Sequence, residues 1–180
     1  QPKKLNYTEI RAKLGATWID TEDYIDFAQY LFKGYSRPQI IYNTFSGQYS
    51  CSFDYYSKRM AESTNIWGTS RMSGTDILDN LLNSKTITIW DKLDLGEGKE
   101  KRVVNKEETA LAREKAQAIK EEFEKWLWKE EYRRTQYEEL ANLSNYDLFK
   151  LYFCFNNDTM SMIHTGQIQY FDASVSYEEL

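Results

Sequence analysis

The stretch from Asn105 to Arg134 constrains the fold most, because it runs for thirty residues without proline or glycine. Asn105 followed by Glu108 is a capping-box pattern, in which an amide oxygen and a carboxylate satisfy free backbone N–H groups at a helix start. Apolar residues recur at helical spacing and form one stripe: Leu111, Ala118, Ile119, Phe123, Trp126 and Leu127. The pattern predicts one continuous amphipathic helix, roughly 45 Å long at 1.5 Å per residue.

Shorter elements are expected to pack along this stripe. Thr21 is a helix-capping residue, with acidic residues in the next turn and Gly34 as the stop signal. Ser46-Gly47 is a turn between two strand-like runs. The expected elements are helices over Thr8–Leu14, from Thr21 to before Gly34 and over Thr75–Leu82, strands Gln39–Phe45, Gln48–Tyr55, Thr86–Trp90 and Lys101–Val104, and an extended piece Thr64–Trp67. They predict an α+β fold, with a small antiparallel β-sheet of hairpins packed on one long helix and two or three shorter helices.

The charge of the chain is unevenly distributed. The formal net charge is −5, yet residues 135–180 contain seven acidic residues and a single basic one, Lys150. We therefore divide the chain into a module, residues 1–134, and an acidic aromatic extension packed on it, residues 135–180. The extension is expected to form a short helix after Ser144 and a hairpin around Thr165-Gly166. A negative surface suits a basic partner, although it equally favours solubility. The candidate partner-binding residues are Glu138, Glu139, Asp147, Asp158, Asp172, Glu178 and Glu179.

Aromatic residues are abundant: 14 Tyr, 9 Phe and 5 Trp. Most are expected to fill a core. One group stands beside basic residues, and its members are Tyr55, Tyr56, Lys58, Arg59, Trp67 and Arg71. Aromatic rings stack on bases while Lys and Arg hold phosphates, so this group is a candidate contact for single-stranded RNA or DNA. The structural alternative places Trp67 in the core and pairs Arg71 with an acid such as Asp76.

The sequence does not identify a catalytic residue. His164 is the only histidine, and the two cysteines, Cys51 and Cys154, lack paired spacing, so they cannot close a zinc shell. Aspartate pairs such as Asp76 with Asp79, or Asp91 with Asp94, are more typical of a solvated surface than of a Mg²⁺ nuclease. Metal-free RNA cleavage needs a general base, an acid and a cationic clamp, which the chain contains at unknown positions. We expect no metal and no cofactor.

Several stretches, taken in order, resemble one family. They are Ile10–Gly15 with Trp18-Ile19, Trp67–Arg71 leading to Ile77-Leu78 and Leu82-Asn83, Lys101–Thr109, and Phe123–Trp128 with Arg133-Arg134. They resemble a segment of very large proteins of Gram-positive mobile elements and phages, which combine an adenine-specific DNA methylase with a SNF2-type helicase. The similar segment lies just upstream of the helicase motor and covers about residues 8–134 here. Because neither a Walker-type motif nor a methylase motif is present, the resemblance implies neither activity.

A short chain with such a module resembles the small anti-CRISPR proteins of streptococcal and related mobile elements. This resemblance implies an inhibitor that binds Cas9 or its guide-RNA complex, either blocking it or damaging the guide. The alternatives are a non-catalytic accessory module that binds nucleic acid or protein, and an RNA-cleaving enzyme. With neither a signal peptide nor a long apolar run, we expect a cytoplasmic protein of the bacterial host cell, without membrane contact. Exposed aromatics also suggest a homodimer.

Overall fold

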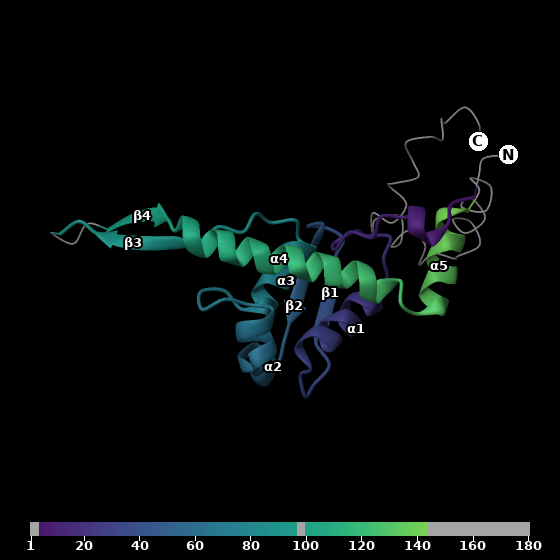
Figure 1. Cartoon of the computed structure of the whole chain (residues 1–180), viewed down its shortest axis with the longest axis horizontal. Helices are drawn as coiled ribbons and strands as arrows, with labels where there is room; N and C mark the ends of the chain where they lie inside the picture. Colours follow the sequence, from purple (N-terminus) through teal and green to yellow (C-terminus); the bar gives the residue numbers. More distant parts are fainter. Residues whose placement is uncertain (1–3, 97–99, 144–180) are drawn as a thin grey trace, which may run out of the picture.

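A computed structural model describes residues 4–96 and 100–143 of the 180-residue chain (Figure 1). Its helical elements are η1 (Tyr7–Glu9), α1 (Thr21–Phe32), α2 (Tyr55–Arg59), η2 (Glu62–Ile66), α3 (Gly74–Leu82), α4 (Lys106–Leu127) and α5 (Glu131–Ala141). Its strands are β1 (Gln39–Asn43), β2 (Gln48–Ser52), β3 (Trp90–Asp94) and β4 (Glu100–Val104). The predicted α+β class is confirmed. The strands form two separate antiparallel hairpins, β1–β2 and β3–β4, instead of one sheet.

Helix α4 runs through the middle of the molecule; α1 and α3 pack on it, and the β1–β2 hairpin packs on α1 and α3 (Figure 1). At the centre of the core, the Phe123 ring of α4 meets the Phe27 ring edge-on, with centroids 4.9 Å apart, and also contacts Tyr24. All three side chains are buried, and each such ring contributes about 1.5–3 kcal/mol through removal of apolar surface from water. The Tyr24 hydroxyl is satisfied because it donates to the Ala16 carbonyl at 2.7 Å.

Capping side chains set where the helices α1, α3 and α4 begin. Asn105 caps α4 as predicted, since its Oδ1 accepts from the Glu108 N–H at 2.9 Å. Helix α1 is capped one residue earlier than predicted, by Asp20, whose Oδ1 accepts from the Glu22 N–H at 3.0 Å. Ser73 caps α3 in the same way. A side-chain oxygen before the first helical residue satisfies an otherwise unpaired N–H group, and this fixes the start.

The prediction of one unbroken helix over residues 105–134 is wrong. Helix α4 ends at Leu127 and α5 begins at Glu131. Arg133 explains the break, because its side chain folds back over α4, where it donates to the Trp126 carbonyl at 3.2 Å and stacks on the Trp126 ring at 3.8 Å. The same carbonyl also accepts from the Lys129 N–H at 3.2 Å, so backbone and side-chain donors from beyond α4 meet at its last turn. The helical sequence pattern runs on through residues 128–130, but the backbone helix is interrupted there and α5 packs separately from α4.

Three shorter predictions also need correction. The second strand ends at Ser52 instead of Tyr55, because Asp54 caps α2. Residues Thr64–Trp67 are not extended: they belong to a π-helical turn, in which the Trp67 N–H donates to the Glu62 carbonyl at 2.8 Å. The predicted helix over Thr8–Leu14 is reduced to the single turn η1.

The segment before β3 runs extended without strand pairing, although Thr86–Trp90 was predicted as a strand. Side chains of α4 take the place of a neighbouring strand. Thr109 Oγ1 accepts from the Ile89 N–H at 2.9 Å, and Arg113 Nε donates to the Ile87 carbonyl at 3.0 Å. Because α4 side chains pair with these backbone groups, no neighbouring strand is needed here, and Ile87 and Ile89 remain buried against the core. Strand pairing begins only at Trp90. From there the β3–β4 hairpin projects beyond the body (Figure 1).

Helix α5 packs against the start of the described chain. Asn142 accepts from the Leu5 N–H at 2.7 Å and donates to the Leu5 carbonyl at 2.8 Å. The Tyr7 N–H donates to Glu138 Oε1 at 2.6 Å. The boundary expected after Arg134 falls inside α5, so residues 135–143 are continuous with the module. The short helix and hairpin expected beyond Ser144 lie outside the described residues.

Candidate nucleic-acid interface

Three tyrosines and two basic residues gather on and beside the short helix α2. We call this group the α2 patch: Tyr35, Tyr55, Tyr56, Lys58 and Arg59. The side chains of Tyr55 and Tyr56 are each 62% exposed and that of Tyr35 is 85% exposed. Their rings form a chain of edge-on contacts, with centroids 5.6 Å apart for Tyr35–Tyr56 and 5.8 Å for Tyr55–Tyr56. The Arg59 guanidinium lies 4.4 Å from the centroid of the Tyr55 ring.

Asp54 positions both parts of the patch. Its Oδ1 accepts from the Ser57 N–H at 2.8 Å and caps α2, while its Oδ2 accepts from the Ser57 and Ser36 hydroxyls at 2.7 and 2.8 Å. These hydrogen bonds, those from Ser57 first, hold the pKa of the Asp54 carboxyl well below its usual range. Since Ser36 directly follows Tyr35, the same carboxylate joins the loop after α1 to helix α2.

Gly34 allows the loop after α1 to lie close to helix α2. A Cβ atom at position 34 would lie 1.8 Å from Ser57 Oγ and 3.1 Å from Asp54 Oδ2. The preceding residue, Lys33, ends α1 in the left-handed conformation with φ of 50°. A left-handed residue followed by glycine turns the chain sharply away from the helix, and this turn brings Tyr35 alongside Tyr56. The stop signal at Gly34 was readable from the sequence, but the partner of Tyr35 was not.

Two residues of the sequence-predicted group lie elsewhere. Trp67 is half-buried and packs against the core next to Gly74. Arg71 Nη1 lies 2.8 Å from Asp91 Oδ1, and its Nη2 donates to the Trp90 carbonyl at 3.2 Å, at the base of the β3–β4 hairpin. The structural alternative therefore describes both residues, with Asp91 instead of Asp76 as the acid. The structure brings together Tyr55, Tyr56, Lys58 and Arg59, and it adds Tyr35.

The cations of the α2 patch are available to a ligand. Neither Lys58 nor Arg59 has a carboxylate within 4.0 Å among residues 4–96 and 100–143. By contrast, the exposed Arg37 forms ion pairs with Glu22 and Asp26, both at 2.7 Å. Within the described part of the chain, the patch therefore combines positive charge that no carboxylate neutralises with exposed tyrosine rings, of which Tyr55 has the Arg59 guanidinium over its ring.

Of the acidic residues proposed to bind a partner, two lie in α5. Glu139 is exposed, and Glu138 is partly buried and accepts from the Tyr7 N–H. Glu138 therefore has a structural role in holding the start of the chain. Asp147, Asp158, Asp172, Glu178 and Glu179 lie outside the described residues, as do His164 and Cys154.

The remaining candidate groups have structural partners. Asp91 accepts from Arg71 and also from Asn105 Nδ2 at 2.8 Å, and these hydrogen bonds, Arg71's first, lower its pKa. Burial, with a smaller contribution from the Asp79 charge, raises the pKa of the Cys51 thiol to about 12. In the described part of the chain, no three His, Cys, Asp or Glu side chains gather closely enough to hold a metal ion.

Comparison with known proteins finds one family, described as a domain of unknown function (DUF8437), whose match covers residues 13–144. This chain belongs to the DUF8437 family. The DUF8437 match contains both hairpins and all of α1–α5, so it includes the whole α2 patch. No curated protein and no solved structure matches the chain. In the part of this DUF8437 chain that the structure describes, every helix is too short or too polar to cross a bilayer.

Proposed function

We propose that this chain is a non-catalytic binding module that takes single-stranded nucleic acid at the α2 patch. The observation that carries the proposal is the chain of exposed tyrosine rings beside Lys58 and Arg59, two cations with no carboxylate within 4.0 Å among the described residues. Exposed rings offer faces for bases, and the cations neutralise phosphates. A protein that binds in this way contacts bases through their faces, so it tolerates many sequences and binds more weakly as salt increases.

The local geometry supports stacking in preference to a buried ligand site. Tyr55 and Tyr56 are successive residues at the start of α2, so their side chains leave the helix in different directions. Their rings lie nearly perpendicular, with an angle of 87° between the planes. Tyr35 meets Tyr56 at 82°. A flexible single strand can turn from one ring face to the next, whereas a stiff duplex cannot unstack its bases to reach them.

The test is binding of fluorescently labelled single-stranded RNA and DNA oligonucleotides of mixed sequence, measured by anisotropy against salt. Tyr56→Ala removes the central ring and should weaken binding about tenfold, given about 1–3 kcal/mol for each stacked base. Arg59→Ala should weaken binding and also reduce its salt dependence. The matched control is Tyr132→Ala, because Tyr132 is also exposed and lies beside an arginine, Arg133, but is in α5.

Two outcomes would contradict the proposal: no binding of either oligonucleotide at low salt, or equal losses for Tyr56→Ala and Tyr132→Ala. Tyrosine and arginine are also common at the centres of protein interfaces. A patch that binds protein alone would give the first of these outcomes.

We propose the Cas9–guide RNA complex as the target of this module, with inhibition of DNA cleavage as the result. Support comes from the resemblance to mobile-element proteins, from the acidic sequence after residue 134, and from the match between the α2 patch and single-stranded RNA. The experiment adds the full chain to Cas9 and guide, then follows DNA cleavage and guide integrity together. Unchanged DNA cleavage would contradict the Cas9 target and leave the nucleic-acid proposal standing. A shortened guide would contradict the non-catalytic assignment.

A further inference from the structure

Trp90, the first residue of β3, is exposed where the other tryptophans are not. The chain contains five tryptophans. The other four are half-buried and pack against the core: Trp18, Trp67, Trp126 and Trp128. Trp90 lies outside that cluster, and 45% of its side chain is exposed. An indole that the core leaves in water has ring surface available to a ligand.

Arg102 of β4 lies over this ring. Side chains on a strand alternate between the two faces of a sheet, so the register places Trp90 on the same face of the hairpin as Lys92 and Arg102. Arg102 is directly opposite Lys92 and diagonal to Trp90, and its guanidinium lies 5.6 Å from the centroid of the Trp90 ring. A guanidinium at this distance is attracted to an indole. One point of the surface therefore combines a flat ring with a permanent positive charge.

The acidic residues on this face of the hairpin leave Arg102 unneutralised. Glu100 Oε2 lies 2.9 Å from Lys92 Nζ, so it is paired with the neighbouring cation. Asp94 Oδ1 accepts from the Gly96 N–H at 2.8 Å, toward the tip. Arg102 has no carboxylate within 4.0 Å among residues 4–96 and 100–143. Its charge is therefore available to a ligand beside the ring.

The base of the hairpin holds Trp90 in place. The Trp90 carbonyl accepts from Arg71 Nη2 at 3.2 Å, while Arg71 Nη1 lies 2.8 Å from Asp91 Oδ1. The other oxygen of Asp91 accepts from Asn105, the capping residue of α4, at 2.8 Å. The backbone at Trp90 is thus tied both to the loop before α3 and to the start of α4. A surface that is already fixed loses little conformational freedom on binding.

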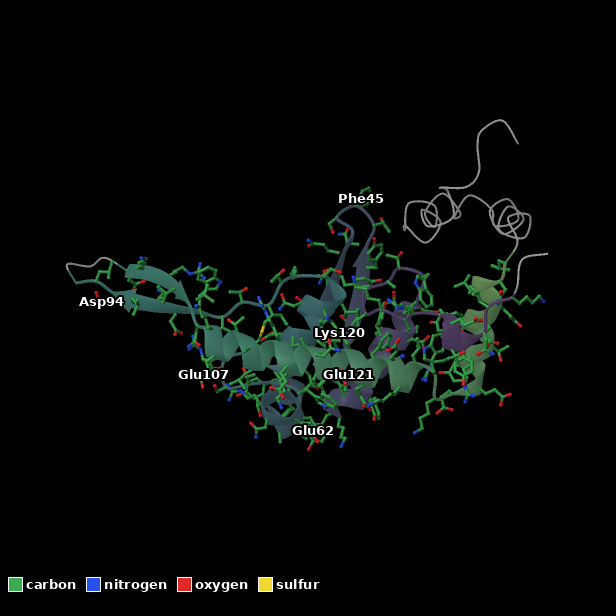
Figure 2. The ribbon with its side chains drawn as sticks, turned by 45° about the horizontal axis from the view of Figure 1, so that its top comes forward. Phe45, Glu62, Asp94, Glu107, Lys120 and Glu121 are labelled. Atoms are coloured by element: carbon green, nitrogen blue, oxygen red, sulfur yellow. The ribbon has the colours of Figure 1, made fainter. Side chains whose placement is uncertain are left out.

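The hairpin stands clear of the body and of the α2 patch. Figure 2 shows Asp94, at the end of β3, farther out than Glu107 in the first turn of α4. Helix α2 packs beside η2 and α3 instead, and Figure 1 shows it as a separate part of the molecule. The Trp90–Arg102 pair is therefore a second surface, carried by a different element.

We propose that the β3–β4 hairpin is a second contact for single-stranded nucleic acid, in which an unpaired base stacks on Trp90 and Arg102 neutralises a neighbouring phosphate. This inference rests on the proposed function, because it assigns a further contact to the same class of ligand. The α2 patch contains the same combination, with the Arg59 guanidinium 4.4 Å from the centroid of the Tyr55 ring.

The repetition of this pair favours a nucleic-acid strand over a protein partner. Each nucleotide supplies one flat base and one negative charge, so a strand can meet the same two groups at two places. A folded protein has no such repeat. A duplex is disfavoured as well, because its bases are already stacked on one another.

The test is a titration of the full chain with single-stranded RNA and DNA oligonucleotides of mixed sequence. Unlabelled oligonucleotide is followed by tryptophan fluorescence, and labelled oligonucleotide by anisotropy. An indole that stacks on a base loses its emission. Because Trp90 is one of five tryptophans, we expect emission to fall by roughly a fifth, in step with the anisotropy. Trp90→Tyr keeps a ring, so it should bind nearly as tightly as wild type, but its emission should no longer fall.

Two further variants separate stacking from packing and charge. Trp90→Leu keeps an apolar side chain without a ring, and should weaken binding at least about fivefold, the lower end for one stacked base. Arg102→Ala should weaken binding and reduce the slope of log affinity against log salt by about 0.7, the value for one phosphate of a single strand. The matched charge control is Lys120→Ala, because Lys120 is an exposed cation in the middle of α4 (Figure 2). It should leave the slope unchanged.

Binding detected by anisotropy without any loss of tryptophan emission would overturn the inference and leave the proposed function standing. So would a Trp90→Leu variant that binds as tightly as wild type, or a Trp90→Tyr variant that binds no more tightly than Trp90→Leu. In Tyr56→Ala, which impairs the α2 patch, emission should still fall, at higher oligonucleotide concentration. If emission falls and Tyr56→Ala leaves the affinity unchanged, the hairpin contact stands and the α2 patch is contradicted.

Discussion

Arg133 of α5 and Asp23 of α1 form a buried ion pair, with Nε 2.9 Å from Oδ1 and side chains only 7% and 9% exposed. The other carboxylate oxygen of Asp23 accepts a short hydrogen bond from the Tyr137 hydroxyl, which in turn accepts from the Asp20 N–H at 3.0 Å. One carboxylate therefore holds two side chains of α5. Buried polar groups of this kind stabilise a fold only when every partner is present.

We predict that Asp23→Asn lowers the free energy of unfolding by about 3 kcal/mol or more, because it leaves the Arg133 charge buried without a counter-charge. The measurement is chemical denaturation followed by circular dichroism. Asp26→Asn is the control, since Asp26 also pairs with an arginine, Arg37, at 2.7 Å, but on the surface. The control should cost less than about 1 kcal/mol. Equal losses for the two variants would show that burial does not govern the Asp23 pair.

Ending the chain after Arg134 should destabilise the module far more than ending it after Leu143. The shorter chain loses Tyr137, which is fully buried and contacts Trp18 and Trp128 edge-on. Removing a buried aromatic side chain costs about 3–5 kcal/mol. Thermal unfolding of the two truncated chains, compared with the full chain, measures the difference. Equal Tm values for the two truncated chains would contradict the packing of α5 described above.

The contribution of Asp54 should depend on pH in a defined direction. Its pKa is lowered on folding by hydrogen bonds from Ser57 and Ser36, so the charged carboxylate stabilises the folded state above the unfolded pKa of about 3.9. This stability is lost as pH falls below that value toward the folded pKa. We expect the stability gap between wild type and Asp54→Asn to be constant near neutral pH and to shrink in acid. Denaturation curves over a pH series measure it, and a gap that widens in acid would contradict the prediction.

The Cys51 thiol should react slowly in the folded protein. Burial raises its pKa to about 12, so the thiolate, which is the reactive form, is scarce near neutral pH. In a Cys154→Ser background, a thiol reagent at pH 8 should modify Cys51 much more slowly in the native protein than in denaturant, where the pKa returns toward about 8.5. Equal rates in the two conditions would mean that the Cys51 thiol is not buried and that its pKa is not raised in the folded protein.

Local signals in the sequence predicted α1, α3 and the start of α4, whereas the break before α5, the short helix α2 and the turn η2 were not predicted. Asn105 and Gly34 mark helix ends through their own chemistry, so α4 starts and α1 stops close to where expected. The break between α4 and α5 has no local marker, because it depends on Arg133 reaching Asp23, 110 residues away. The segment at Ile87 and Ile89 resembled a strand because both are β-branched, yet its partners are the Thr109 and Arg113 side chains of α4 and the Asn105 N–H just before that helix.

The candidate site divides in the same way. Tyr55, Tyr56, Lys58 and Arg59 are neighbours in sequence, and α2 keeps them together. Trp67 and Arg71 are near in sequence but have other partners, because the turn η2 (Glu62–Ile66) separates them from α2 along the chain, Trp67 packs against the core and Arg71 pairs with Asp91. Tyr35 was missed because its link to α2 passes through the carboxylate of Asp54, and nothing near Tyr35 in the sequence indicates that contact.

The clasp between Leu5 and Asn142 has a consequence for longer polypeptides. It holds the first and last turns of the described fold side by side, through two hydrogen bonds of 2.7 and 2.8 Å. Domains whose ends lie close together tolerate insertion into another protein, because the host chain leaves and resumes at nearly the same point. This fold is therefore suited to insertion into a loop of a larger polypeptide, because the two ends of that loop would not have to move apart.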